Sequence, residues 1–358
     1  MRTRKSSLLA LAGAALFALA APAHGAAAPR KQFHVAWSIY VGWMPWDYAA
    51  ESGILKKWAD RYGIEIELTQ INDYVESINQ FTAGKFDGCV MTNMDALTIP
   101  AAGGVDSTAL IVGDFSNGND GVVLKAKGKK LADLKGQSIH LVELSVSHYL
   151  LARGLAAAGL TERDVKVVNT SDADIVAAFG APSTTATVTW KPQLSEILKA
   201  KDAQLVFDSS KIPGEIIDLM VVKTEVLKEH PALGKALVGA WYETLGVLTG
   251  GGAPAQAAKA AMARASGTDL AGFEEQLSTT RLFAKPAEAL AFFESPNLVA
   301  TMDQVRKFSF AHGLLGEGAK TVDAVGIAFP KAKPLGNAAN VKLRFDPSFT
   351  RLAADGKL

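Results

Sequence analysis

Short apolar runs rich in β-branched residues alternate with longer segments of helical periodicity along the first part of the chain. This alternation predicts strands at 33–39, 64–68, 86–91 and 108–112, with helices at 47–62, 74–83 and 96–102. Strand and helix in turn are typical of a parallel sheet with helices on both faces.

A second series of the same kind begins after Gly121-Val-Val-Leu124. It predicts strands at 138–142, 165–168, 185–189, 204–207 and 219–222, with helices at 146–157, 173–179 and 193–200. Beyond Thr224 the pattern becomes helical and poor in strands, and residues 320–358 are expected to form a loop-rich tail.

Two α/β series of this length indicate two lobes, because about 330 residues exceed what one hydrophobic core usually organises. We expect an α/β clamshell of two doubly wound sheets, joined by two chain crossings near 121–125 and 220–224. The predicted boundaries are 27–122 with 224–358 for lobe I and 123–223 for lobe II.

The first 26 residues have the charge and hydrophobicity pattern of a secretory signal peptide. Arg2, Arg4 and Lys5 precede an apolar stretch that is too short to span a bilayer, and small residues follow it. The alternative is a buried Ala/Leu helix. No cysteine follows the apolar stretch, so we expect no lipid anchor. Removing those three from the 37 basic residues leaves 34 against 36 acidic ones, which argues against a nucleic-acid or membrane-surface partner.

Ligands of open α/β sheets bind beyond the carboxyl ends of the strands, so the loops after each predicted strand are the candidates for a site. The first of these loops, WSIYVGWMPWDY at 37–48, is unusually aromatic. Trp43 and Trp46 are predicted to form flat walls, and Asp47 to supply a charged acceptor. The alternative is that Asp47 only caps the helix that begins there.

The later loops add further candidates of the same polar and aromatic kinds. The predicted ligand-binding residues beyond the first loop are Asn93, Asp95, Asp114, Glu143, Ser147, His148, Trp190 and Glu215. Several of these residues also have a purely structural interpretation: Asp95 could cap a helix, and His148 could be a structural histidine. The nearby Asn119 and Asp120 could form an ordinary turn.

Four segments together resemble the periplasmic binding proteins of nitrate, sulfonate and taurine transporters. They are DYAAESGILK at 47–56, AGKFDG at 83–88, LADLKGQS at 131–138 and TWKP at 189–192, and the resemblance runs from about residue 33 to 250. TNMD at 92–95 with GDFSNG at 113–118 is similar to the subgroup associated with urea carboxylase genes.

The resemblance implies the two-lobed type II periplasmic binding protein fold. It implies a monomer in the periplasm that delivers a small molecule to an ABC permease and its ATPase. A secreted sensor that presents its ligand to a membrane kinase is the alternative with the same pocket.

The candidate acids decide which ligand we expect. Five of the predicted site residues are carboxylates (Asp47, Asp95, Asp114, Glu143 and Glu215), and Lys191 is the one cationic residue nearby. Burying several carboxylates around an anion is costly, so a urea- or guanidine-like compound is favoured. The alternatives are nitrate, or an alkylsulfonate such as taurine.

We predict that the protein is not an enzyme and holds no catalytic residues, metal or cofactor. The sequence contains no phosphate-binding glycine loop, no nucleophile elbow, and no His/Cys cluster at metal-ligand spacing. The alternative is a pyrimidine-synthase-like enzyme on the same fold, which the predicted signal peptide disfavours.

Overall fold

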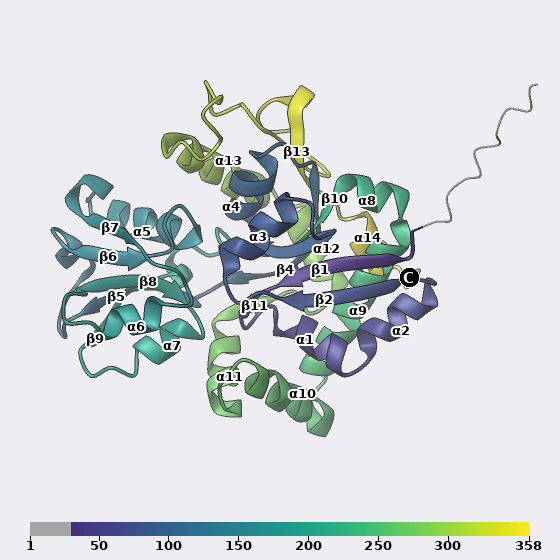
Figure 1. Cartoon of the computed structure of the whole chain (residues 1–358), viewed down its shortest axis with the longest axis horizontal. Helices are drawn as coiled ribbons and strands as arrows, with labels where there is room; N and C mark the ends of the chain where they lie inside the picture. The colour runs from purple at the N-terminus through teal and green to yellow at the C-terminus, as the bar shows by residue number, and fades with distance from the viewer. Residues whose placement is uncertain (1–29) are drawn as a thin grey trace, which may run out of the picture. The chain divides into compact units, whose positions relative to one another are not determined.

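Two β-sheets organise residues 31–358 in the computed structural model, which describes residues 30–358 (Figure 1). The predicted signal peptide at 1–26 lies outside the described residues. The first sheet has eight strands: β1 (Gln32–Trp37), β2 (Glu65–Gln70), β3 (Gly88–Thr92), β4 (Ser107–Ser116), β10 (Ile217–Lys223), β11 (Thr280–Leu282), β12 (Gly326–Ala328) and β13 (Val341–Phe345). The second has five: β5 (Asp120–Lys125), β6 (Ser138–Leu141), β7 (Lys166–Asn169), β8 (Ala186–Trp190) and β9 (Ala203–Asp208).

Helices connect and cover these strands. The helices that come before β9 in the chain are α1 (Met44–Glu51), α2 (Ile54–Arg61), α3 (Tyr74–Thr82), α4 (Asn93–Ala96), α5 (Val146–Ala157), α6 (Ile175–Gly180) and α7 (Gln193–Ile197). Those that follow it are α8 (Thr224–Glu229), α9 (Pro231–Thr249), α10 (Gly252–Ala265), α11 (Leu270–Ser278), α12 (Pro286–Phe293), α13 (Pro296–Ala311) and α14 (Ser348–Ala354). Short turns of other helix types are the π-helical η1 (Leu97–Ala101) and the 3-10 turns η2 (Leu131–Leu134), η3 (Glu162–Asp164), η4 (Ser209–Lys211) and η5 (Ala338–Asn340).

Both sheets are mixed, whereas the sequence pattern predicts parallel ones. The main strand order is β12-β13-β4-β10-β3-β1-β2 in the first sheet and β7-β6-β8-β5-β9 in the second. β10 runs antiparallel to β3 and β4, and β5 runs antiparallel to β8 and β9. The reason is that the chain reaches β5 and β10 by crossing from the other sheet. Each of these strands therefore starts at the edge of its sheet where the parallel strands end, and runs in the opposite direction.

The two crossings lie beside each other and are joined by hydrogen bonds. The chain leaves the first sheet after Ser116 and returns to it after Ser209, and the hydroxyl oxygens of these two serines lie 2.6 Å apart. The backbone N–H of Gly118 donates to the Ser209 hydroxyl over 2.8 Å. These bonds hold the two connections together at the base of the space between the sheets.

Two other expectations differ from the structure. The helix predicted at 47–62 is interrupted at Gly53, whose φ of 78° lies in the left-handed region that ends helices, so that α1 and α2 are separate. The tail is more regular than predicted, because β13 pairs in parallel with β4 through Leu343, Arg344 and Phe345 and extends the first sheet. A strand of five residues is too short to give a clear alternating pattern, so the sequence did not predict it.

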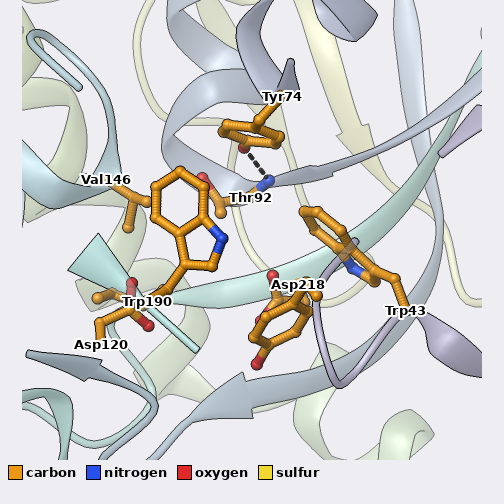
Figure 2. Close-up of a pocket in the computed structure, with 9 residues that line it drawn as sticks. Trp43, Tyr74, Thr92, Asp120, Val146, Trp190 and Asp218 are labelled. Atoms are coloured by element: carbon orange, nitrogen blue, oxygen red, sulfur yellow. Dashed lines mark hydrogen bonds between the residues drawn. The ribbon is translucent and has the colours of Figure 1, made fainter. Parts of the chain in front are cut away.

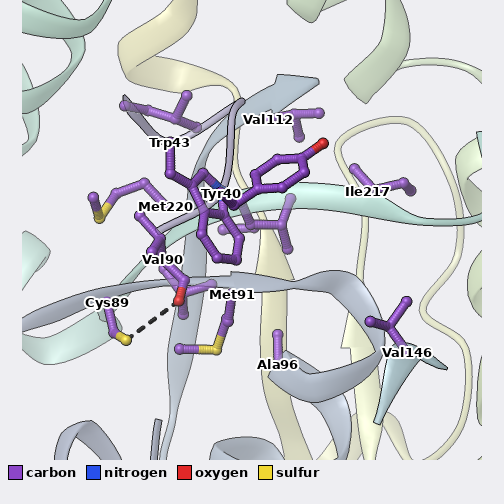
Figure 3. Packing of buried hydrophobic residues seen from close by; sticks show 14 of the residues in the cluster. Tyr40, Trp43, Cys89, Val90, Met91, Ala96, Val112, Val146, Ile217 and Met220 are labelled. Carbon is purple, nitrogen blue, oxygen red and sulfur yellow. Dashed lines mark hydrogen bonds between the residues drawn. The ribbon is translucent and has the colours of Figure 1, made fainter. Parts of the chain in front are cut away.

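The aromatic loop after β1 packs directly over the first sheet. Figure 3 shows Tyr40 and Trp43 above the buried side chains of β3 and β10, among them Val90 and Met220. Cys89 lies in the same layer and is fully buried, and burial raises the pKa of its thiol to about 12. This core fixes the position of the loop without a ligand.

Candidate ligand-binding site

A cavity with a volume of about 20 Å³ lies between the two sheets. Its lining comes from both sheets and from the loops between them (Figure 2): Tyr40, Trp43, Tyr74, Thr92, Asp120, Val146, Trp190, Ile216 and Asp218. This volume is about that needed by one water molecule, so only a very small guest fits without further opening of the cavity.

Four of the lining residues form a connected set of rings, which we call the aromatic cage: Tyr40, Trp43, Tyr74 and Trp190. Neighbouring ring centroids are 5.0 Å apart for Tyr40 and Trp43, 5.7 Å for Trp43 and Tyr74, and 5.6 Å for Tyr74 and Trp190. In Figure 2, Trp43 and Trp190 lie on opposite sides of the cavity. Ring faces at such spacing attract a cation or stack on a flat group.

Tyr74 is held in the cage by its hydroxyl group. Asp73 caps α3 by accepting a hydrogen bond from the Glu76 N–H, which places Tyr74 at the first position of that helix. The Tyr74 hydroxyl donates to Asp95 Oδ2 over 2.6 Å and accepts from the Thr92 N–H over 2.9 Å. Burial raises the pKa of the Asp95 carboxyl to about 6, although the hydrogen bonds that it accepts from the hydroxyls of Tyr74 and Thr92 lower it.

Three carboxyl groups, which we call the carboxyl cluster, lie at one side of the cage: Asp114 at the end of β4, Asp120 at the start of β5 and Asp218 at the start of β10. Each side chain is almost completely buried. Tyr40 connects the cluster to the cage, since its hydroxyl donates to Asp114 Oδ1 over 3.0 Å. Ser116 donates to Asp120 Oδ2.

Burial dominates the electrostatics of this cluster. It raises the pKa of both Asp114 and Asp120 to about 7. Burial also raises the pKa of Asp218 well above its ordinary value, and the negative charge of Asp114 adds to the effect. The side chains that shift these three pKa values most are Tyr40, Ser116 and the carboxyls of the cluster itself, and none of these is a lysine or an arginine. At neutral pH the cluster is therefore partly ionised, because two of its pKa values lie near 7 and the raised pKa of Asp218 favours its protonated form.

The cluster also has hydrogen-bonding capacity that the described residues leave unused. Oδ2 of Asp114 and Oδ2 of Asp218 have no partner there outside the hydrogen bond that these two carboxyls share, and Oδ1 of Asp120 is buried and has no hydrogen-bond partner there. The same is true of the indole N–H of Trp43. Buried polar atoms are normally paired, so three acceptor oxygens beside an aromatic cage suit a ligand that is rich in N–H donors.

The structure brings four of the sequence-predicted residues to this site or next to it. Trp43 and Trp190 line the cavity as opposing walls. Asp114 belongs to the carboxyl cluster and binds Tyr40, while Asp95 lies behind the cage and binds Tyr74. Asp114 and Asp95 therefore do not line the cavity themselves, but each accepts a hydrogen bond from a tyrosine that does.

Three other predicted residues lie on helices of the half built on the first sheet and do not line the cavity. Trp46 is buried against Trp241 in a stack with ring centroids 5.1 Å apart, and it does not line the cavity. Asp47 is half-buried on α1. Asn93 holds the second crossing: its Oδ1 accepts from the Ile217 N–H over 3.0 Å, and its Nδ2 donates to the Glu215 carbonyl over 3.1 Å.

The remaining predicted residues also do not line the cavity. Glu143 is exposed, and Ser147 is buried with a hydroxyl that has no partner among the described residues. His148 pairs with Glu162. The carboxylate of Glu215 is neutralised by Arg153, with Nε 2.8 Å from Oε2, and it also accepts from Tyr149.

Sequence reasoning omitted Tyr40, Tyr74 and Asp218 from the site and interpreted Asp120 as a possible turn. Tyr40 lies in the aromatic loop, whose composition was a usable signal. Lys191, the one cation expected nearby, is buried and pairs with Glu275. The basic group that would have offset the carboxyl cluster is therefore bound to another acid.

No helix in residues 30–358 has both the length and the apolar character needed to cross a membrane. The model of the NMT1-like family matches residues 27–265. A Brucella abortus protein that carries the provisional name of a binding protein is 25% identical over 193 residues, which cover 53% of this chain and 58% of that protein. This chain therefore matches less than two thirds of the length of that relative.

Two further proteins are similar to this chain in sequence or in fold. The taurine-binding periplasmic protein of Escherichia coli is 24% identical over 143 residues, covering 39% of this chain and 44% of that protein. The alkanesulfonate-binding protein SsuA of Xanthomonas axonopodis pv. citri, solved with bound MOPS, superimposes with a TM-score of 0.66 at 18% identity, covering 83% of this chain and 99% of that one. The mixed α/β fold with two sheets is that of periplasmic binding proteins.

Proposed function

Since this chain belongs to the NMT1-like family and has the fold of periplasmic binding proteins, we propose that it is the solute-binding component of an ABC importer. Its relatives bear the names of binding proteins for small solutes. In this role the protein captures its ligand in the cavity between the two sheets and delivers it to a membrane permease. Two crossings beside each other support a hinge on which the two halves close over the ligand.

We further propose that the ligand is a small, flat nitrogen cation of the guanidinium type. The observation that carries this proposal is the carboxyl cluster beside the aromatic cage, whose buried acceptor oxygens include three that accept from no N–H or hydroxyl donor among the described residues. Guanidinium is planar, positively charged and offers six N–H donors in the plane of the ion. Its faces stack on rings while its edge meets carboxylates.

One feature of the cavity favours an anion instead. α5 begins at Val146, which lines the cavity, and the start of a helix carries about half a positive charge. The carboxyl cluster opposes it with three acidic groups, which exceed that partial charge once even one of them is ionised. The balance of charge therefore disfavours nitrate and sulfonates, although relatives bind sulfonates.

Isothermal titration at pH 8 tests the proposal with four ligands: guanidinium chloride, urea, sodium nitrate and taurine. We expect guanidinium to bind most tightly, and urea more weakly because it is isosteric but uncharged. Binding of nitrate or taurine with no response to guanidinium would overturn the choice of ligand and leave the transport role intact. The absence of binding to any small solute of these classes would argue against both.

A further inference from the structure

A second polar cluster lies outside the cavity and joins three separate segments of the chain. It consists of His148 on α5, Glu162 on η3 and His312 directly after α13. The Nε2 atom of His148 lies 2.5 Å from Glu162 Oε1, and the Nε2 atom of His312 lies 2.5 Å from Glu162 Oε2. The two imidazole rings are 5.4 Å apart between centroids.

The hydrogen bonds of His312 require a positive species in this cluster. Its Nδ1 atom lies 2.8 Å from the carbonyl oxygen of Phe308, which can only accept, so Nδ1 carries a proton. In a neutral ring Nε2 then has a lone pair, and this lone pair points at the carboxylate of Glu162. Two lone pairs repel each other at that distance, so either a second proton or a metal ion must lie between them.

We propose that His148, Glu162 and His312 form a binding site for a divalent transition-metal ion of the zinc type. Two imidazole nitrogens and one carboxylate oxygen are a common ligand set for Zn²⁺, and a water molecule completes the fourth position. The bond from His312 Nδ1 to the Phe308 carbonyl is the outer-shell contact that usually orients a metal-binding histidine. The Glu162 side chain is 32% exposed, which gives an ion a route into the site.

Metal binding requires two small adjustments. Ligand atoms of one tetrahedral Zn²⁺ lie about 3.3 Å apart for bonds of about 2 Å, so the side chains must separate slightly from their present contacts. The Nδ1 atom of His148 accepts from the Leu144 N–H over 3.1 Å, which places the ring proton on Nε2. Coordination through Nε2 moves that proton to Nδ1 at the cost of this one hydrogen bond.

The location of the cluster gives the metal a structural consequence. His148 and Glu162 belong to the half of the protein built on the second sheet, whereas α13 packs on α4 of the first. An ion held by both halves stabilises the arrangement in which they are close together. It should therefore raise the melting temperature as well as bind.

Zinc titration of tag-free, chelator-treated protein tests the site, with ZnCl₂ in calorimetry and Co²⁺ as an absorbing substitute. We expect one ion per chain, a rise in melting temperature, and the intense visible bands of four-coordinate Co²⁺. His312→Ala and Glu162→Gln should each weaken binding by at least the roughly 100-fold that loss of an outer-shell contact can cost. His34→Ala is the matched control, because His34 forms a similar pair with Glu67 at the surface.

Circular dichroism of each variant establishes that it is folded, and the conservative Glu162→Gln change covers the case in which His312→Ala does not fold. Zinc affinity that is equal in wild type and both variants would overturn the proposal. The proposal would also be overturned if the wild type did not bind zinc and its stability depended on pH through these two histidines. That second result would identify the positive species as a proton.

Discussion

Asp120→Asn separates the contribution of the carboxyl cluster to binding from its cost to stability. Asp120 is fully buried, and burial raises its pKa from 3.8 to about 7. The folded protein therefore holds a proton on this group between about pH 4 and 7 that the unfolded chain has lost, so the free energy of unfolding falls as pH rises through this window. Roughly three pKa units at 1.36 kcal/mol each amount to about 4 kcal/mol above pH 7.

The asparagine variant does not pay this electrostatic cost. We expect the ligand-free variant to be more stable than the wild type at pH 8 by about 2–4 kcal/mol, with the upper end reduced because the new amide needs its own partners. At pH 5 most of this gain should disappear, since the wild-type carboxyl is then protonated. Urea unfolding followed by tryptophan fluorescence at both pH values measures the difference.

The same substitution should weaken guanidinium binding. A hydrogen bond to a charged group contributes about 1.5–3 kcal/mol, so affinity at pH 8 should fall by roughly 10- to 150-fold. Asp202→Asn, at an exposed turn of the same half, is the control that should change neither quantity. The reasoning fails if Asp120→Asn binds guanidinium as tightly as the wild type, or if its stability relative to the wild type is the same at pH 5 and pH 8.

Three further predictions follow from the same contacts. Guanidinium affinity should fall as pH drops from 8 to 6, because protons compete for carboxyls whose pKa is about 7; calorimetry over a pH series that shows no slope would contradict this. Trp43→Ala should weaken binding by roughly 2- to 30-fold, because about 0.5–2 kcal/mol of cation–π attraction is lost. Trp46→Ala should instead lower the free energy of unfolding by about 3–5 kcal/mol and leave the affinity of the folded protein nearly unchanged. Glu143→Gln should leave affinity unchanged in the same titration, since Glu143 is exposed and does not line the cavity; a large loss would mean that the cleft recruits it on closure.

The alternation of strands and helices predicted the α/β fold, and the rule that ligands meet the carboxyl ends of parallel strands predicted part of the candidate site. The rule located Trp190 at the end of β8 and Asp114 near the end of β4. It omitted Asp218 and undervalued Asp120 for one shared reason. Both acids stand at the amino ends of the two crossing strands, which run antiparallel, so that their starts rather than their ends face the cavity.

Side-chain direction explains why other predicted residues do not line the cavity. Trp43 and Trp46 are three positions apart on one turn, yet the first faces the cavity and the second faces α9, where Trp241 stacks on it. Glu215 precedes β10 in the loop of the second crossing, and its carboxylate turns to Arg153 instead of the cavity. A strand boundary in the sequence locates a loop, but it does not give the direction of each side chain in that loop. Arg153 is 62 residues away from Glu215 in the sequence, so only the fold brings the two together.

The acid excess predicted from the sequence therefore stands on different residues. Asp47 and Glu143 do not line the cavity and Glu215 is neutralised, but Asp120 and Asp218 take their place beside Asp114. A fold gains nothing from three buried carboxyls without basic partners, because each one costs stability at neutral pH and an apolar or amide side chain of similar size would not. Under the proposed function, a flat, positively charged and donor-rich ligand recovers this cost, because its N–H groups meet the carboxyls while its faces stack on the neighbouring rings.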